Sequence, residues 1–253
     1  MSDQAHTDAN DSSQYHHGIS DLVSVIKMHS LTRLGRLILP RGLWHGKHGH
    51  GDNEDIAAMP EDPGSLYLTF DDGPNPKSTP YLLELLEGEN VTATFFLIGR
   101  QVERHPSLVK RIADAGHVVG NHSYAHLFIP ALSVTKIETE IHLANHRIEE
   151  ITGKSPTLFR PPFGIIDQRA ADCLKERGMT PVYWGAVPED WEKIGSRRVV
   201  QRVFRQLSPG SLIVLHELDW NASQTLKATR EIIKRLKGKG YCFKSIKCGA
   251  SPA

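Results

Sequence analysis

The sequence predicts an α/β protein built as a distorted (β/α)7-type barrel, with mostly parallel strands inside and helices outside. From Ser65 onward, short apolar runs alternate with longer stretches of helical periodicity, and such a repeated strand–helix pattern is typical of a parallel sheet covered by helices. Seven strand units fit into about 185 residues, which makes the barrel smaller than the eight-unit barrel of about 250 residues. An open, doubly wound sheet is the alternative.

Each expected element is read from its local composition. The expected strands are short runs of apolar, aromatic or β-branched residues at 66–70, 93–98, 117–119, 157–160, 180–184, 211–215 and 241–246. The expected helices have apolar residues at helical spacing and lie at 80–88, 106–115, 133–151, 167–177, 196–207 and 222–237. Thr79 followed by Pro80 predicts a capped helix start, and Ser133 can cap the longest helix.

The first 60 residues predict an extension ahead of a main domain at 61–253. Residues 1–18 are polar and carry almost no apolar side chains, which predicts disorder. Residues 19–41 place apolar residues at helical spacing among several Lys and Arg, so a basic amphipathic helix is expected. We favour packing of this helix against the main domain over peripheral contact with an anionic membrane. The His/Gly-rich stretch at 44–51 is expected to be a linker rather than a metal site.

Composition excludes several classes of function. Hydrophobic residues make up 39% and charged residues 23% of the 253 residues, which is the profile of an ordinary soluble protein. Lys and Arg number 30 against 29 for Asp and Glu, so no nucleic-acid-binding surface is indicated. Three cysteines, Cys173, Cys242 and Cys248, lack the spacing of a metal site and suggest reduced thiols. The sequence shows neither a bilayer-spanning apolar run nor a secretory signal, which favours a cytoplasmic location.

The first expected strand stops at two adjacent carboxylates. Residues 66–70 run into Asp71-Asp72-Gly73-Pro74, which is a strong turn signal. Adjacent buried carboxylates repel each other, so they need a cation, a shared proton or strong hydrogen-bond donors. Taken alone, this stretch is explained equally well by an ordinary Asp-Gly turn.

Polar residues suited to catalysis follow four further strands as well. In barrels of this kind, ligands and catalytic groups gather at the carboxyl ends of the strands. We therefore expect the side chains at these five strand ends to face one another across one mouth. They are Asp71, Asp72, His122, His126, Arg160, Asp190, Trp191 and His216.

The spacing of two of these histidines favours a metal site. His122 and His126 are separated by three residues and can face one way. A lone pair at this spacing is usually structural, but with one carboxylate it forms a facial triad that leaves positions open for water and substrate. The second carboxylate would then stay free to act as a base, and a nearby arginine can hold it ionised. A separate histidine can protonate a leaving group, so the residues predict a metallohydrolase.

From about residue 65 to 246 the sequence resembles the polysaccharide deacetylases, the NodB homology domain of carbohydrate esterase family four. One family motif alone is moderately specific, but here all five occur in the family order. They are Thr69-Phe70-Asp71-Asp72-Gly73, the pair His122 and His126, Arg160-Pro161-Pro162-Phe163-Gly164, Asp190-Trp191, and Leu212-Ile213-Val214-Leu215-His216.

The resemblance implies the chemistry of the central residues. Asp72, His122 and His126 would bind a divalent metal, which is zinc in most of the family and cobalt or nickel in some members. Asp71 would be the catalytic base, and His216 would be the general acid.

The resemblance also implies supporting roles. Arg160 would orient the base, and Asp190 would pair with the general acid. The Phe163 backbone N–H would contribute to the oxyanion hole. Trp191 would wall the acetyl pocket, with Val214 beside the acetyl methyl group.

Three positions depart from the family pattern. Val187 stands where the fourth motif usually has an Asp, three residues before Asp190. Glu217 replaces the Asp that usually follows the acid His, and Phe163 replaces a common Tyr. The change at Phe163 should be mild, because the backbone supplies the donor. The change at Val187 bears on local hydrogen bonding and substrate choice, but it removes no residue predicted for metal binding or proton transfer.

The predicted function is metal-dependent removal of N-acetyl groups from an oligo- or polysaccharide containing N-acetylglucosamine, with release of acetate. The expected partner is therefore an acetylated glycan. The alternatives are an O-acetyl esterase, a deformylase acting on a lipid-linked sugar, and a catalytically inactive sugar-binding module. The last is disfavoured, because the matched catalytic positions keep competent side chains. Since peptidoglycan requires an exported enzyme, the lack of a visible export signal favours a chitooligosaccharide or a lipid-linked sugar.

Overall fold

The computed structural model of the chain describes Pro40, Gly42 and residues 64–246. Apart from Pro40 and Gly42, the expected extension at 1–60 lies outside the described residues, and so does Cys248. The Pro40 carbonyl accepts a 2.9 Å hydrogen bond from the Tyr183 hydroxyl. A Cβ at Gly42 would lie 2.5 Å from the Tyr183 ring, so the backbone passes too close for a side chain there.

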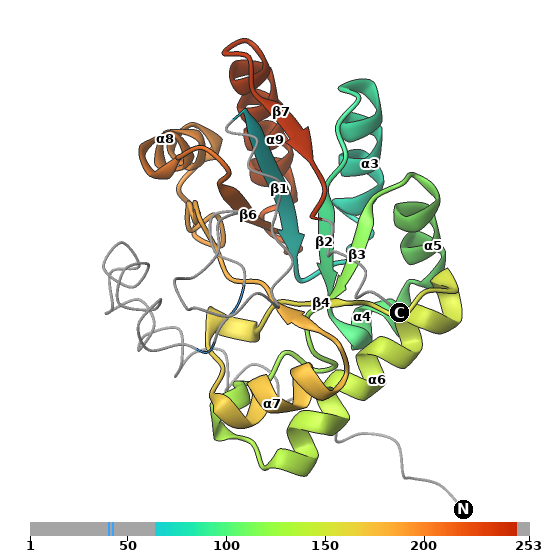
Figure 1. Ribbon diagram of the computed structural model, residues 1–253. Coiled ribbons are helices and arrows are strands. Elements are labelled where there is room, and N and C mark those ends of the chain that lie inside the picture. Colours follow the sequence, from blue (N-terminus) through green and yellow to red (C-terminus); the bar gives the residue numbers. More distant parts are fainter. Residues whose placement is uncertain (1–39, 41, 43–63, 247–253) are drawn as a thin grey trace, which may run out of the picture. The chain divides into compact units, whose positions relative to one another are not determined.

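The described strands form one parallel sheet (Figure 1). They are β1 (Ser65–Asp71), β2 (Thr94–Leu97), β3 (Val118–Asn121), β4 (Leu158–Phe159), β5 (Thr180–Pro181), β6 (Leu212–His216) and β7 (Cys242–Lys244). Their order is β5-β4-β3-β2-β1-β6, and β7 pairs with β1 off this path. The strand β5 is shorter than expected, because Pro181 has no N–H to donate to a neighbouring strand.

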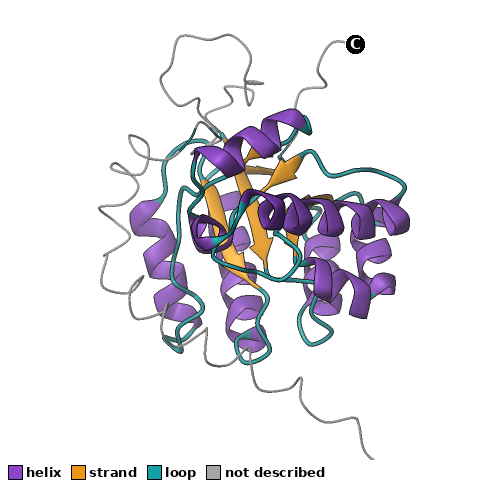
Figure 2. Ribbon diagram, turned by 90° about the horizontal axis from the view of Figure 1, so that it is seen from below, coloured by secondary structure: helices purple, strands orange, loops and turns teal. Residues whose placement is uncertain are grey.

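The sheet curls until its two ends nearly meet. Ala186, which follows β5, forms a parallel bridge with Ile213 of β6. The Ala186 N–H donates to the Leu212 carbonyl at 2.8 Å. Figure 2 shows the strands enclosed by helices. The predicted distorted (β/α)7-type barrel, with parallel strands inside and helices outside, is therefore confirmed.

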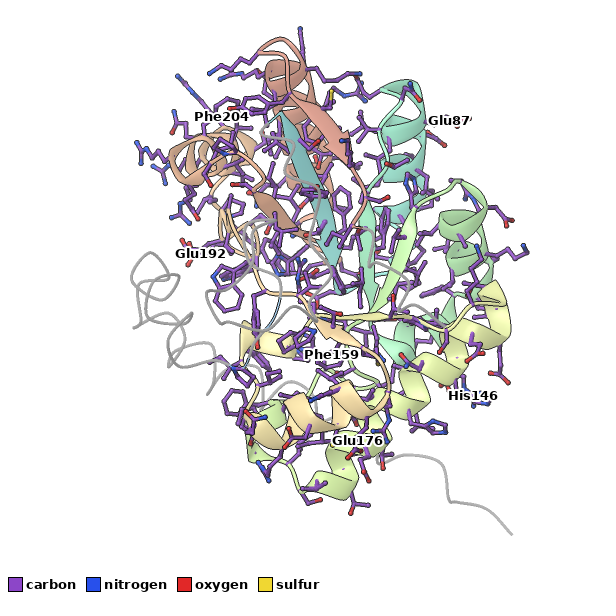
Figure 3. The ribbon with its side chains drawn as sticks, viewed as in Figure 1. Glu87, His146, Phe159, Glu176, Glu192 and Phe204 are labelled. Atoms are coloured by element: carbon purple, nitrogen blue, oxygen red, sulfur yellow. The ribbon has the colours of Figure 1, made fainter. Side chains whose placement is uncertain are left out.

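The helices pack around this sheet, and side chains fill the space between the two (Figure 3). They are α3 (Thr79–Gly88), α4 (Gly99–Arg104), α5 (Pro106–Asp114), α6 (Val134–Thr152), α7 (Gln168–Glu176), α8 (Ser196–Gln206) and α9 (Ala222–Lys237), with 3₁₀ turns at Ile129–Ala131 and Pro162–Gly164. All expected helices are present within about two residues of their predicted bounds. The short helix α4 was not expected, because it begins at a glycine and is too short to show periodicity. No described helix is long and apolar enough to cross a membrane.

Two helix starts test the capping predictions. The Ser133 hydroxyl accepts from the Lys136 N–H at 3.3 Å and caps α6, as expected. The start of α3 is different, because Thr79 is its first residue and Ser78 occupies the cap position without a capping hydrogen bond. The Thr79 hydroxyl donates instead to Glu217 at 2.6 Å. This contact joins residues far apart in the sequence, so local patterns could not reveal it.

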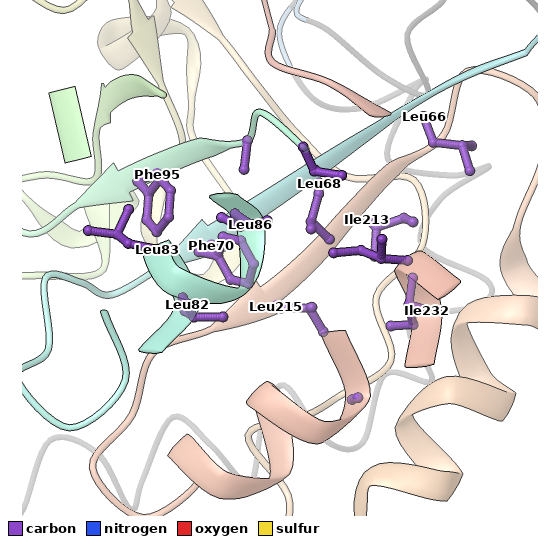
Figure 4. Close-up of a cluster of buried hydrophobic side chains, with 14 of the residues drawn as sticks. Leu66, Leu68, Phe70, Leu82, Leu83, Leu86, Phe95, Ile213, Leu215 and Ile232 are labelled. Carbon is purple, nitrogen blue, oxygen red and sulfur yellow. The ribbon is translucent and has the colours of Figure 1, made fainter. Parts of the chain in front are cut away.

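Alternate side chains of β1 face two different clusters. On one side, Leu66, Leu68 and Phe70 pack into the main core with residues of α3, β2, β6 and α9 (Figure 4). On the other side, Tyr67 belongs to a second buried cluster with Phe96, Leu158, Val182, Leu212 and Ile246. Because side chains alternate along a strand, Thr69 and Asp71 share the face of Tyr67. The strand therefore carries Asp71 on the inner face of the curled sheet.

Candidate active site

Loops at the carboxyl ends of the strands have unusual backbone conformations. Within the described part of the chain, the residues other than glycine with positive φ are Asp72, Asn90, Ser123, His126, Phe163 and Glu189. All except Asn90 lie in loops that follow β1, β3, β4 or β5 and carry the predicted motifs. Positive φ is uncommon outside glycine, and it persists where the surroundings fix a functional geometry. The loops with positive φ are thus the same loops that carry the predicted polar site residues.

Asp71 is held at the end of β1 by a buried arginine. Its Oδ1 accepts a 2.7 Å hydrogen bond from Arg160 Nη1, and the same Nη1 donates to Thr69 Oγ1 at 2.6 Å. The guanidinium also lies over the Phe96 ring, 4.2 Å from its centre. Asp71 and Arg160 are each only 3% exposed, so water hardly screens this charge-assisted pair. Arg160 therefore holds the carboxylate in one orientation.

Asp72 contacts different residues from those that contact Asp71. Its φ of 73° ends the strand geometry. Its Oδ1 lies 3.4 Å from His122 Nε2 and 3.3 Å from His126 Nε2. This oxygen is buried and forms no hydrogen bond with any residue that the structure describes. The ligand atoms of the three residues lie within 4.8 Å of one another. A buried carboxylate oxygen and two imidazole nitrogens are a donor set that fits a divalent metal.

The backbone orients these two imidazoles. His122 Nδ1 lies 2.6 Å from the Arg160 carbonyl oxygen, so Nδ1 carries the proton and the Nε2 lone pair faces Asp72. The backbone N–H of His126 donates to Ser123 Oγ at 2.9 Å. Burial acts to raise the pKa of Asp72, but the charge of His126 and the contacts with His122 outweigh it and hold this pKa well below its usual range. Asp72 is thus an anion held beside two nitrogen ligands.

The residues that shape the histidine loop were not predicted from the sequence. The Ser123 N–H donates to Asn121 Oδ1 at 2.7 Å, and the Ala125 N–H donates to Glu140 Oε2 at 2.7 Å. The Asn121 contact is an Asx turn, which an Asn ahead of a loop could have indicated. Glu140 is fully buried in α6, and no local signal connects it with the loop.

His216, at the end of β6, is paired with Asp190. Its Nδ1 lies 2.8 Å from Asp190 Oδ1, and its backbone N–H donates to Oδ2 at 2.9 Å. The Trp191 ring meets the imidazole at 86°, with 5.0 Å between centres. Burial acts to lower the pKa of His216, but the charge of Asp190 and its hydrogen bond outweigh burial and raise this pKa to about 9. The imidazole is therefore a cation at neutral pH and can donate a proton.

The first turns of α9 hold this pair in place. Asn221 Nδ2 lies 3.2 Å from the His216 carbonyl oxygen and 3.3 Å from the Asp190 carbonyl oxygen. Gln224 Nε2 donates to the same Asp190 carbonyl at 2.8 Å. The Thr225 hydroxyl lies 3.1 Å from Asp190 Oδ2. These three residues were missed in the sequence, because only the folded loops bring them to Asp190.

Known proteins share this arrangement of sequence and fold. The polysaccharide deacetylase family model matches residues 58–182. A peptidoglycan-N-acetylglucosamine deacetylase of Bacillus cereus is 37% identical over 190 residues, which cover 74% of this chain and 89% of that protein. The chain belongs to the polysaccharide deacetylase family. The resemblance predicted from the five motifs is thereby confirmed.

Other polysaccharide deacetylases differ in what they act on. A chitooligosaccharide deacetylase of Azorhizobium caulinodans is 30% identical, covering 75% of this chain and 96% of that protein. The solved structure of the peptidoglycan N-acetylglucosamine deacetylase Bc1960 matches with a TM-score of 0.71 at 34% identity, covering 74% of this chain and 88% of the other. BA3943, a CE4 family pseudoenzyme from Bacillus anthracis, matches with a TM-score of 0.68 at 31% identity, covering 72% and 64%. Since the fold also occurs in a pseudoenzyme, the fold alone does not establish activity, which depends on the side chains in the site.

In this polysaccharide deacetylase the loop that carries Asp190 is anchored by α8. At Val187, where the family pattern has a carboxylate, the N–H and the carbonyl both bond to the Gln206 side chain at 2.9 Å. Glu189 pairs with Arg202 of the same helix. The Val187 side chain is buried, so helix contacts fix this loop where the family motif has an Asp.

The second departure from the polysaccharide deacetylase pattern, Glu217, ties β6 to the start of α3. The carboxylate is 2% exposed, and its Oε2 accepts from Ser78 at 2.7 Å and Thr79 at 2.6 Å. A Cβ at Gly73 would lie 2.4 Å from Oε1, so a larger residue there would displace this carboxylate. Burial raises the pKa of Glu217 to about 7, although both hydroxyls act to lower it. Glu217 thus packs against the residue that follows Asp72.

Phe163 and Val214 are the two residues that the sequence predicts to lie around the acetyl group. Phe163 has φ of 58°, and its N–H donates to no group in the described part of the chain. Its ring packs against that of His126, with 4.9 Å between centres. Val214 lies beside Thr69 in the register of β6 on β1 and is 5% exposed. The Phe163 N–H is available to a substrate oxygen.

Proposed function

We propose that this chain is a metal-dependent hydrolase that removes N-acetyl groups from glycans containing N-acetylglucosamine, releasing acetate. The observation that carries the proposal is the division between two adjacent carboxylates at the end of β1. Asp71 is bonded to Arg160, whereas Asp72 faces the imidazoles of His122 and His126. The named activities of the relatives from Bacillus cereus and Azorhizobium caulinodans support this class of substrate.

Three residues would hold the metal. A divalent ion would be bound by Asp72, His122 and His126, and we propose zinc, with cobalt or nickel as alternatives. When bound, such an ion supplies a Lewis acid for the acetyl carbonyl and lowers the pKa of coordinated water. The orphaned Oδ1 of Asp72 and the two Nε2 atoms directed at it support this assignment.

Asp71 takes the proton of the attacking water. Its carboxylate must be ionised to do so, and it forms a 2.7 Å ion pair with the buried Arg160. Because Thr69 and Phe96 also contact Arg160, the base is held in one orientation. A positioned general base contributes about 10²–10⁴-fold to the rate.

His216 gives a proton to the departing amine on the other side of the substrate. An amine leaves poorly unless it is protonated, so an amidase needs a dedicated acid. Asp190 keeps His216 charged for this step. The Phe163 N–H donates to the oxygen that gains charge in the transition state. Trp191 and Val214 bound the space for the acetyl group.

The inactive sugar-binding alternative is disfavoured by the residues that this chain keeps. A pseudoenzyme with the same fold exists, but here Asp71 pairs with Arg160 and His216 pairs with Asp190, so the proposed base and the proposed acid each keep a charged partner. Neither pair is needed merely to hold a sugar, and burying charge without use is costly.

A panel of substrates tests the proposed function. The metal-loaded full chain is incubated with chitooligosaccharides, peptidoglycan, acetylxylan, a lipid-linked formamido sugar and acetylated sugar nucleotides, and acetate and formate are quantified. We expect acetate from a glycan containing N-acetylglucosamine and none from acetylxylan, with Asp71→Asn as the inactive control. Release of formate, or of acetate from acetylxylan alone, would assign one of the alternative reactions instead. No product from any substrate with metal bound would favour the pseudoenzyme.

A further inference from the structure

An exposed tryptophan lies in the loop that follows the proposed general acid and takes no part in the proposed chemistry. Among the described residues, the large apolar side chains that are exposed are Tyr81, Val134 and Trp220. Trp220 is 45% exposed and lies in the loop between β6, which ends at His216, and α9. An indole left in water forgoes the free energy of burial, which a bound ligand can recover.

Both neighbours of Trp220 are fixed to the active site. On one side, Asn221 bonds to the backbone of the paired residues His216 and Asp190. On the other side, Asp219 accepts hydrogen bonds of 2.8 Å from Asn75 and from Lys77, in the loop that follows Asp72. The loop carrying Trp220 therefore bridges the general acid and the proposed metal site.

A lysine from a second active-site loop steadies the ring. Lys193 Nζ lies over the Trp220 ring, 5.8 Å from its centre. Lys193 comes two residues after Trp191, in the loop of the fourth family motif. A cation over an indole at an exposed site is a weak but directional attraction. The contact restrains the ring, while 45% of the residue stays exposed to solvent.

We propose that Trp220 is a platform on which the sugar unit next to the N-acetylglucosamine being hydrolysed stacks. A pyranose ring with equatorial substituents presents an apolar face of C–H groups, and this face matches the exposed part of an indole in size and polarity. Lys193 limits the motion of the ring, so little side-chain entropy is lost on binding. The ligand is a β-linked oligosaccharide of at least two units, and the inference rests on the proposed deacetylase function.

The first test compares two lengths of substrate. For the metal-loaded full chain and for Trp220→Ala, kcat and KM are measured on N-acetylglucosamine, on chitotetraose and on a peptidoglycan tetrasaccharide. We expect the ratio of kcat/KM for tetrasaccharide over monosaccharide to fall about five- to tenfold in Trp220→Ala, mainly through KM. Trp220→Phe should recover part of the loss, because it keeps an aromatic face. An unchanged ratio in Trp220→Ala would overturn the proposal.

A binding measurement separates failure of the platform from failure of the proposed function. Asp71→Asn and Asp71→Asn with Trp220→Ala are titrated calorimetrically with both tetrasaccharides, so turnover is not required. Weaker binding only in the double variant supports the platform even if no substrate is hydrolysed. Equal affinities of the two variants, or no binding of either tetrasaccharide, would refute it whatever the activity.

The chain supplies a matched control for Lys193. Lys239 Nζ lies over the Phe204 ring at 5.2 Å, but Lys239 precedes β7 and so lies at the opposite, amino end of the strands. Figure 3 shows Phe204 well apart from Glu192, the neighbour of Lys193. We expect Lys193→Ala to weaken tetrasaccharide binding about twofold and Lys239→Ala to leave it unaltered. Equal effects of the two substitutions would assign the change to general charge and contradict the restraint by Lys193.

Discussion

The geometry at the end of β1 gives two adjacent aspartates, Asp71 and Asp72, different partners. Asp71 continues the alternation of β1, so its side chain lies on the inner face, where Arg160 and Thr69 meet it. Asp72 leaves the strand with a positive φ and directs its oxygen to His122 and His126. A one-residue shift of this strand would exchange the two roles, because alternate residues face opposite sides.

We expect the charge of His216 to set one limb of the pH profile. As the acid it must be protonated, and its pKa is raised to about 9 by Asp190, so we expect kcat/KM to fall as pH rises through about that value. Asp190→Asn removes the stabilising charge, which lowers the pKa of His216 and moves this alkaline limb to lower pH. The measurement is kcat/KM against pH, with the exposed Asp172→Asn as the control. A limb that stays in place in Asp190→Asn would rule out the pairing.

At the scale of elements, helices fix the loops that carry the chemistry. The helix α8 holds Val187 through Gln206, and α9 holds Asp190 through Asn221 and Gln224. Glu217 holds the start of α3 by accepting hydrogen bonds from Ser78 and Thr79. Its burial raises its pKa and makes this contact sensitive to pH.

Glu217 should make the stability of the metal-free protein fall with rising pH. Its pKa is raised from 4.5 to about 7 in the fold, so the folded state binds the proton more tightly than the unfolded state. The stabilising effect of that proton is complete below pH 4.5 and is lost as pH rises through about 7. Glu217→Gln keeps a neutral side chain and should gain about 3 kcal/mol over the wild type between pH 5 and 8.

Urea unfolding across this pH range measures the difference in the free energy of unfolding. The control is Glu84→Gln, because Glu84 lies exposed on α3 and should track the wild type within about 0.5 kcal/mol. Parallel curves for Glu217→Gln and the wild type would show that Glu217 is ionised in the fold throughout.

At the scale of the whole molecule, the sequence was most informative where one local pattern decided the structure. The apolar run at 66–70 is buried along its length, and its end at Asp71 predicted where the polar residues gather. Contacts between distant residues could not be predicted. Ser78 and Glu217 are 139 positions apart. The Thr79 hydroxyl donates to the same Glu217 carboxylate instead of capping its helix.

The catalytic domain should work without the extension, and we propose that it spans residues 61–253. All proposed catalytic residues lie beyond Ser65, so a protein that starts at Pro60 should keep its kcat on a small soluble substrate. It loses the hydrogen bond from Tyr183 to Pro40, so its stability should fall by about 1 kcal/mol. Assays and urea unfolding of both lengths check this. A large drop in kcat with intact circular dichroism would show that the extension reaches the active site.

The central claim is that Asp72 binds the metal and Asp71 moves the proton. It is tested by metal stoichiometry and kcat for Asp71→Asn and Asp72→Asn across one titration of zinc. Asp72→Asn should bind metal weakly and recover part of its activity at high zinc, because a neutral amide is a poorer ligand. Asp71→Asn should keep its metal yet lose about 10²–10⁴-fold in kcat, without rescue by added zinc. If Asp71→Asn loses the metal while Asp72→Asn retains it, the two roles are reversed and the account is contradicted.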